Sequence, residues 1–354
     1  MVWNWWTLLA GLHGHIDFVD AFHVRGWAAD RWGMAPELAI QVDGRTVDRI
    51  VPTYIRDDLQ TWFRHSPRLG FYYVFDDPVP AGAMISITDI HGRALSNSPQ
   101  VVPPPHEQSL PEVVDGLTTP VPEPHLIYLV AGHRDRFKFA MTRRPPVDYI
   151  IERLKAAGAD HATFDAILDF GCGCGRILAG WEGRLSVHTK LLGCDINPRL
   201  VAFCAANIPF ATSFVSNYLP PLETIAAGEI DFLYAASVFT HLNESAARDW
   251  VDEIRRVLKP GGLVMMSFHG NSFRDVLASI SKKGIREFDR HGFYCHIHGL
   301  PNRSRPGSNE YATFMTPDFT IGLFDGFEVV EMIPSVNHGN PFSAAQDVAI
   351  FRRV

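Results

Sequence analysis

The stretch that decides the fold is AILDFGCGCGRIL, residues 166–178. Its first residues form a short apolar run, which is typical of a buried parallel strand. Three glycines follow at alternate positions, Gly171, Gly173 and Gly175, and glycine permits both tight turns and the close approach of a ligand to the backbone. A helical pattern begins at Arg176. A strand, a glycine turn and a helix N-terminus in this order predict a nucleotide pocket at the end of a parallel sheet.

The kind of nucleotide can be narrowed from the same residues. The dinucleotide pattern G-x-G-x-x-G requires a third glycine at position 176, where the chain has Arg176. The phosphate-binding pattern G-x-x-x-x-G-K-[ST] is absent from the sequence. A glycine-rich turn without a ligand is the remaining alternative, because short motifs of this kind also occur by chance.

The segment after the turn favours a ligand. Residues 191–195 read as a second strand that ends in Asp195, which lies 20 residues beyond Gly175. This is close to the spacing at which an acidic residue meets the ribose of a nucleotide, and a carboxylate can accept hydrogen bonds from both vicinal hydroxyls. Asn197 and Pro198 are typical of a helix N-cap and a first helical position.

Two later segments extend the pattern into a resemblance. Residues 230–242 (IDFLYAASVFTHL) and 256–262 (RVLKPGG) occur in the order and at the spacing of the fourth strand, and of the turn before the fifth strand, in class I S-adenosylmethionine-dependent methyltransferases. From about residue 140 to 354 the chain resembles this family. The resemblance implies an α/β fold with a Rossmann-like seven-stranded sheet and S-adenosyl-L-methionine as the cofactor.

The resemblance also implies a set of cofactor-binding residues. These are Asp169, Gly171, Cys172, Gly173, Gly175, Asp195, Ile196, Asn217 and Ser237. The chain departs from the family at the third strand, where residues 214–217 lack an acid that is often found there. Either Asn217 recognises the adenine, or no residue of this strand does.

Composition excludes several classes of protein. The 354 residues are 46% hydrophobic and 20% charged, as in ordinary globular proteins, and the net charge of −7 argues against a nucleic-acid partner. The five cysteines include no C-x-x-C pair, so we expect reduced thiols and no metal site. The apolar segment Met1–Leu12 is too short to span a bilayer, so we expect no transmembrane segment and a cytoplasmic location. Trp3, Trp5 and Trp6 suggest a hydrophobic contact, and a homo-oligomer is one possibility.

Residues 1–102 are predicted to form a small all-β sandwich. Turn residues separate short runs at 16–24, 38–42, 45–47, 71–75 and 83–89, and Asp43-Gly44, between the second and third runs, is a strong hairpin signal. The pattern Gly26–Asp30, Arg56–Leu59 and Gly70-Phe71 resembles an accessory module of bacterial polysaccharide-pathway glycosyltransferases and methyltransferases. Its role is open between packing or dimerisation and glycan binding.

A proline-rich segment, residues 103–124, is predicted to be a stiff linker. It separates the sandwich from the methyltransferase domain, residues 125–354. Within that domain the apolar periodicity predicts helices over 146–157 and 244–258 and a fifth strand over 263–268. Strands at 327–332 and 347–351 are expected to form the closing hairpin, and residues 126–133 are expected to begin a lid over the nucleotide.

Two histidines are candidates for catalysis. Methyl transfer to a hydroxyl also requires the loss of a proton, for which an imidazole can serve as the base. His241 follows the fourth strand and His269 follows the fifth, at the sheet edge where ligands of α/β proteins bind. The alternative is that either histidine only packs or caps a helix. His296 and His298 would share one face of a strand, as a metal pair requires, although such pairs are also common by chance.

Three functions compete at this point. The first is a methyltransferase that acts on a hydroxyl of a carbohydrate or another small metabolite. The second is a non-catalytic S-adenosylmethionine-binding or scaffold protein whose sandwich binds a partner or glycan. The third is a nicotinamide-dependent enzyme, against which Arg176 argues. Arg303, Arg305 and Tyr311 could contact an acceptor or could belong to a solvated loop.

Overall fold

The computed structural model describes residues 11–53, 59, 68–75, 78–104, 116–297, 307–335, 340–343 and 345–354. The chain forms two compact units, Met1–Gln108 and Ser109–Val354. The boundary between them lies within the segment 103–124. That each unit folds independently stays a prediction. The tryptophans at positions 3, 5 and 6 lie outside the described residues, as do His298, Arg303 and Arg305.

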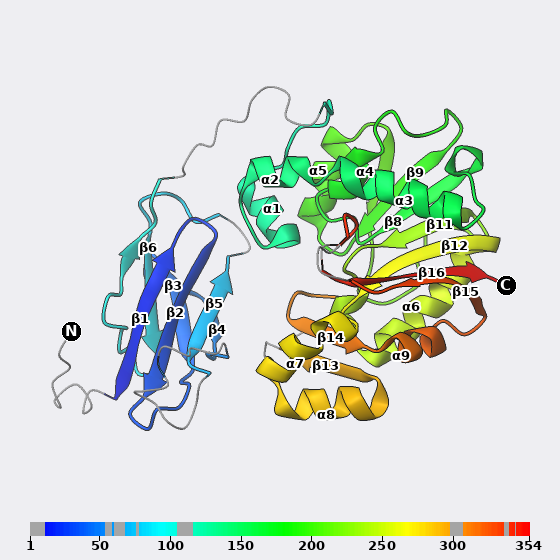
Figure 1. Ribbon diagram of the computed structural model, residues 1–354. Coiled ribbons are helices and arrows are strands. Elements are labelled where there is room, and N and C mark those ends of the chain that lie inside the picture. Colours follow the sequence, from blue (N-terminus) through cyan, green and yellow to red (C-terminus); the bar gives the residue numbers. More distant parts are fainter. Residues whose placement is uncertain are drawn as a thin grey trace. The chain divides into compact units, whose positions relative to one another are not determined.

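The first unit contains two antiparallel sheets (Figure 1). One has the strand order β1-β2-β5 and the other β4-β3-β6-β7. The strands are β1 (Leu12–Val19), β2 (His23–Asp30), β3 (Leu38–Val42), β4 (Arg45–Ile50), β5 (Gly70–Val74), β6 (Met84–Asp89) and β7 (Gln100–Val101). Val24 and Phe71 of one sheet share a buried core with Ile40 and Ile87 of the other. This arrangement is consistent with the predicted sandwich.

Two turns in this unit follow directly from the sequence. Asp43 and Gly44 connect β3 and β4 with φ angles of 48° and 78°, so the predicted hairpin is confirmed. The run at 16–24, however, is a hairpin and not one strand. The Asp20 carboxylate accepts hydrogen bonds from the backbone N–H groups of Phe22 and His23, which turns the chain between β1 and β2.

The second unit is built on a seven-stranded sheet with the order β10-β9-β8-β11-β12-β16-β15. Its strands are β8 (Ala166–Phe170), β9 (Lys190–Asp195), β10 (Ala211–Val215), β11 (Ile230–Ala235), β12 (Leu258–Phe268), β15 (Phe327–Ile333) and β16 (Asp347–Arg353). The first five are parallel, and β16 is antiparallel to both of its neighbours. This is the predicted Rossmann-like sheet, closed by the predicted hairpin.

Helices cover both faces of this sheet (Figure 1). One face is covered by α3 (Arg144–Ala156), α4 (Arg176–Gly180) and α5 (Pro198–Asn207), and the other by α6 (Glu244–Val257) and α9 (Pro317–Leu323). Two short helices, α1 (Pro124–Ala131) and α2 (Arg136–Met141), precede α3. None of the helices in the described parts of the chain combines the length and the apolar character that crossing a membrane requires.

Local capping explains where the two predicted helices stop and start. After α3, Gly158 has a φ of +76° and donates to the carbonyl of Lys155, as expected of a glycine at a helix C-terminus. Before α6, the Asn243 side chain accepts from the N–H of Ala246 at 2.9 Å. The helix α3 begins at Arg144, two residues earlier than the pattern indicated.

The fifth strand differs from the prediction at its start. It begins at Leu258 rather than Leu263, because Leu258 already pairs with Ile230 of β11. The register of the two strands then shifts within residues 259–262, and Leu263 pairs with Phe232. Between β12 and β15 lies an insertion that the sequence marked only by its length. It contains α7 (Arg274–Ile280), α8 (Lys282–His291), the antiparallel pair β13 (Phe293–Ile297) and β14 (Tyr311–Met315), and α9.

Candidate functional site

The glycine turn connects β8 to α4 and is fixed to the neighbouring strand. The N–H groups of Gly171 and Cys172 both donate to the carbonyl of Cys194, at 2.8 and 2.9 Å. Gly171, Gly173 and Gly175 have φ angles of +82°, +54° and +78°, a region that other residues rarely adopt. The sequence motif therefore predicts the backbone of this turn correctly.

Side chains from elsewhere in the unit close on the same turn. A Cβ on Gly171 would lie 2.3 Å from Val238 Cγ2, and one on Gly173 would lie 2.7 Å from Val130 Cγ2. Val130 belongs to α1, so the predicted lid segment is a helix that packs against the turn. The turn thus requires glycine for space as well as for conformation.

Asp195 organises the turn from the end of β9. Its Oδ2 accepts from the N–H of Gly173 at 2.9 Å, and its Oδ1 accepts from the N–H of Asn197 at 2.8 Å. Burial raises the pKa of this carboxyl above its usual value, and the two backbone donors act in the opposite direction. Each oxygen keeps a second lone pair, so the carboxylate can still accept from a ribose.

Asp169, at the end of β8, is buried and incompletely bonded. Its Oδ2 is enclosed and has no hydrogen-bond partner among the described residues, while the Tyr234 hydroxyl bonds to the carboxyl group. Burial raises the pKa of Asp169 to about 8, against the opposing effects of Tyr234 and of the nearby Arg176. An enclosed oxygen without a donor suits a ligand that brings a donor or a positive charge. S-adenosylmethionine carries both, so these residues fit the predicted cofactor.

Four of the five cysteines surround this turn as free thiols. Cys172 and Cys204 both donate to the carbonyl of Gly173, at 3.6 and 3.4 Å, and Cys174 donates to the carbonyl of Leu126. Burial raises the pKa of the Cys174 and Cys194 thiols. These cysteines pack as small apolar residues, in agreement with the expected reduced thiols.

The remaining predicted cofactor residues differ in how well they are placed. Ser237 follows β11 and has a φ of +63°. It forms hydrogen bonds with two side chains: its N–H donates to Ser267 Oγ, and its Oγ accepts from Gln346 Nε2. Ile196 is half-buried beside Asp195. Asn217 is exposed beyond β10, and whether it contacts adenine stays a prediction.

The two predicted catalytic histidines are brought together by one strand of the insertion. His241 Nδ1 lies 2.8 Å from the carbonyl oxygen of Tyr311, and His269 Nδ1 lies 3.1 Å from that of Thr313. Tyr311 and Thr313 are two residues apart on β14, so their carbonyls point to the same side. Because a carbonyl can only accept, each Nδ1 is assigned the hydrogen, and each Nε2 is left as the acceptor.

Burial keeps both imidazoles in the base form. It lowers the pKa of His241, and burial together with the neighbouring His241 lowers the pKa of His269 to about 4. Both rings are therefore neutral at pH 7. The His269 ring also packs against those of Phe273 and Phe314, at centroid distances of 4.2 and 5.2 Å.

The hypothesis of a histidine metal pair gains no support from the described residues. His296 lies on β13, and His298 falls outside the described chain. In the described part of the chain, no group of three or more histidine, cysteine or acidic side chains could hold a metal ion.

Sequence reasoning missed the residues that orient this side of the site. The Gln346 side chain forms hydrogen bonds with both Ser237, which follows the end of β11, and Ser267, near the end of β12. The β14 carbonyls that bind the histidines are backbone groups of an insertion. No spacing in the sequence could reveal these contacts, because pairing across the sheet edge creates them.

A Rossmann-like sheet with a glycine turn, and an acid at the next strand end, defines a nucleotide-binding α/β protein. Residues 167–262 match a family model described as a methyltransferase domain. The match supports a class I, S-adenosylmethionine-dependent methyltransferase, and S-adenosylmethionine is the cofactor, as the sequence predicts.

Individual relatives are more distant. A tRNA (carboxymethyluridine(34)-5-O)-methyltransferase of Arabidopsis thaliana is 28% identical over 145 residues, which are 40% of this chain; the chain spans only 31% of that relative. A methyltransferase structure from Methanosarcina mazei is 19% identical with a TM-score of 0.41, covering 54% of this chain and 92% of that one. Magnesium protoporphyrin IX methyltransferase from Synechocystis, with bound SAH, is 13% identical with a TM-score of 0.41, covering 62% and 87%.

Proposed function

We propose that the protein transfers the methyl group of S-adenosylmethionine to a hydroxyl of a carbohydrate or another small metabolite, with His241 or His269 as the base. The observation that supports this proposal most is the pair of neutral imidazoles at the exits of β11 and β12. Each has its Nδ1 bound to a β14 carbonyl, which leaves Nε2 as an acceptor.

The chemistry requires little else from the protein. The cofactor supplies the methyl group and the leaving group, so the chain positions the acceptor, excludes water and accepts one proton. A hydroxyl is a poor nucleophile while protonated, and a positioned base typically contributes about 10²–10⁴-fold. A neutral imidazole with a fixed tautomer is suited to this step.

Charge supports a small acceptor over a nucleic acid. The net charge of −7 would repel a phosphate backbone, whereas proteins that bind RNA or DNA usually have a basic surface. The location is inferred from a different feature. The five cysteines are free thiols, and thiols stay reduced in the cytoplasm, so we infer a cytoplasmic location.

The direct test is incubation of the full chain with methyl-labelled S-adenosylmethionine and a panel of free sugars, sugar nucleotides and polysaccharides. We expect label on at least one acceptor, in an alkali-stable ether linkage, and reduced transfer by Asp195→Ala at a cofactor concentration near the dissociation constant of the parent. Tight cofactor binding without transfer to any acceptor would favour the scaffold alternative. Transfer to tRNA alone would replace the small-molecule acceptor by an RNA.

A further inference from the structure

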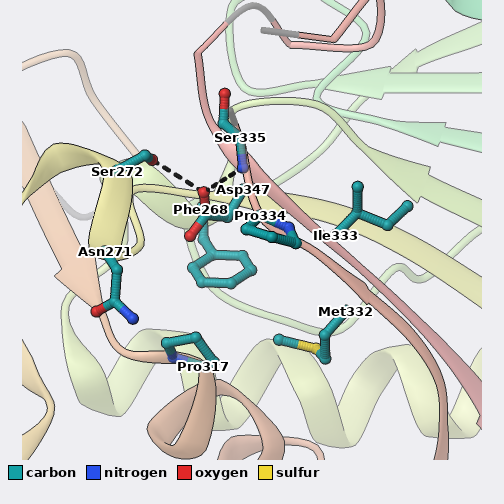
Figure 2. Close-up of a pocket in the computed structure, with 9 residues that line it drawn as sticks. All are labelled: Phe268, Asn271, Ser272, Pro317, Met332, Ile333, Pro334, Ser335 and Asp347. Carbon is teal, nitrogen blue, oxygen red and sulfur yellow. Dashed lines mark hydrogen bonds between the residues drawn. The ribbon is translucent and has the colours of Figure 1, made fainter. Parts of the chain in front are cut away.

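A cavity of about 390 Å³ lies where β12 ends, at the carboxyl edge of the sheet (Figure 2). It is formed by the end of β12, the start of the insertion, the N-terminus of α9 and the two strands of the closing hairpin. Its walls are mostly apolar and include Phe268, Pro317 and Met332. Cavities of roughly 300–1,000 Å³ are the usual size of small-molecule sites.

One acidic side chain, Asp347, lines this cavity and is only 3% exposed. Its Oδ1 accepts from Ser272 Oγ at 2.9 Å and from the N–H of Ser335 at 2.8 Å, as Figure 2 shows. Its Oδ2 accepts no hydrogen bond within the described chain, and no described lysine, arginine or histidine forms an ion pair with it. The carboxyl group therefore has one oxygen to offer to a ligand.

The absence of a side chain at Gly270 leaves room for Asp347 Oδ2. A Cβ on Gly270 would lie 1.9 Å from Asp347 Oδ2, so a larger residue at 270 would displace the carboxyl group. The φ of Gly270 is −91°, outside the left-handed region that favours glycine, so the space taken by Asp347 Oδ2 is the reason for a glycine that the structure shows here.

A buried carboxylate without a cationic partner is costly, and a ligand of opposite charge offsets that cost. A primary ammonium is the group that fits, because it brings both a positive charge and hydrogen-bond donors to Oδ2. The apolar walls then suit the carbon skeleton next to that ammonium.

The cavity and the candidate base share one strand end. Phe268 in the cavity wall directly precedes His269, and Asn271 and Ser272 follow it within three residues. We propose that this cavity binds the ammonium group of the methyl acceptor, which makes the acceptor an amino alcohol or amino sugar. The inference rests on the proposed function for the identity of the ligand as acceptor.

The test uses matched pairs of compounds with the full chain: aminohexanol against hexanediol, and glucosamine against glucose. Binding is measured by calorimetry and by ligand-observed NMR, and turnover is measured with labelled S-adenosylmethionine. We expect the ammonium member of a pair to bind roughly tenfold more tightly than its neutral partner, the effect of one charged hydrogen bond.

The matched variant is Asp347→Asn, whose Oδ1 can still accept from Ser272 and Ser335 while Oδ2 is replaced. We expect it to lose the preference for ammonium compounds through a higher KM, with kcat and cofactor affinity nearly unchanged. Asp318→Asn, an exposed carboxyl next to Pro317, is the control and should keep the preference.

The outcomes separate the two proposals. Binding that prefers ammonium and depends on Asp347, without methyl transfer to these compounds or to any acceptor of the labelling panel, supports the cavity assignment and contradicts the proposed function. Methyl transfer with equal binding of charged and neutral partners contradicts the cavity assignment and supports the function. The comparison of charged and neutral compounds uses the parent protein, so it decides the matter even if Asp347→Asn fails to fold.

Discussion

At the scale of single residues, Asp169 and Asp195 both lie near the carboxyl ends of neighbouring strands but differ in environment. Asp195 binds two backbone N–H groups, whereas Asp169 has one oxygen with no partner among the described residues. The sequence predicts the position of both acids, because the motif and its spacing are local. It could not predict the difference, because Tyr234, the side chain that bonds to the Asp169 carboxyl group, comes from β11.

The two histidines carry the main prediction at this scale. At least one of His241→Ala and His269→Ala should lower turnover by about 10²–10⁴-fold, since a positioned base contributes that much. Cofactor affinity should stay nearly unchanged, because neither ring bonds to the glycine turn. The measurement is single-turnover kinetics on the acceptor found by the labelling experiment.

His291→Ala is a suitable control, because His291 is exposed at the end of α8. Parent-level turnover in both histidine variants would rule out an imidazole base.

The pH dependence of turnover tests the same assignment without a mutation. Because burial lowers the pKa of both rings, to about 4 for His269, the base form persists below pH 6.5. The acid limb of kcat/KM should then lie below 6.5, and near 4 if His269 is the base; a limb at 6.5 would contradict the assignment.

At the scale of elements, the sequence predicts what repeats with a regular period or follows a motif. The helices α3 and α6 and the hairpin β15–β16 lie within a few residues of their predicted bounds. The start of β12 was wrong, because the pairing of Leu258 with Ile230 continues the strand through residues that read as a turn.

The strand β14 is an element that the sequence did not predict. Its position is set by pairing with β13 and by contact with the end of β12, where Met315 donates to the carbonyl of His269. Both contacts join segments that are far apart in the sequence. An insertion in which the sequence predicted no helix therefore orients the candidate catalytic groups.

At the scale of the whole molecule, the boundary between the two units lies at residues 108 and 109, within the proline-rich segment. We expect each unit to fold independently, because each has its own buried core. Limited proteolysis should cut within 103–124 and leave two folded fragments, and the larger should still bind S-adenosylmethionine. A larger fragment that loses the cofactor would contradict independence.

The role of the first unit is less constrained by the sequence. Its hairpins could be predicted because turn chemistry is local, as at Asp43 and Gly44. The pairing of β2 with β5 joins strands about 40 residues apart, and residues between them lie outside the described chain. A packing or dimerisation role and a glycan-binding role both stay predictions.

The measurement that tests the central claim most directly is calorimetric titration of S-adenosylmethionine into the parent protein, Asp195→Ala and the exposed control Asp249→Ala. A charged hydrogen-bonding partner contributes about 1.5–3 kcal/mol, so Asp195→Ala should bind roughly tenfold more weakly or worse, and the control should match the parent. Thermal unfolding must accompany the titration, because Asp195 also binds the N–H of Gly173. Equal affinity of Asp195→Ala and parent, or a nicotinamide cofactor bound tightly in place of S-adenosylmethionine, would contradict the account.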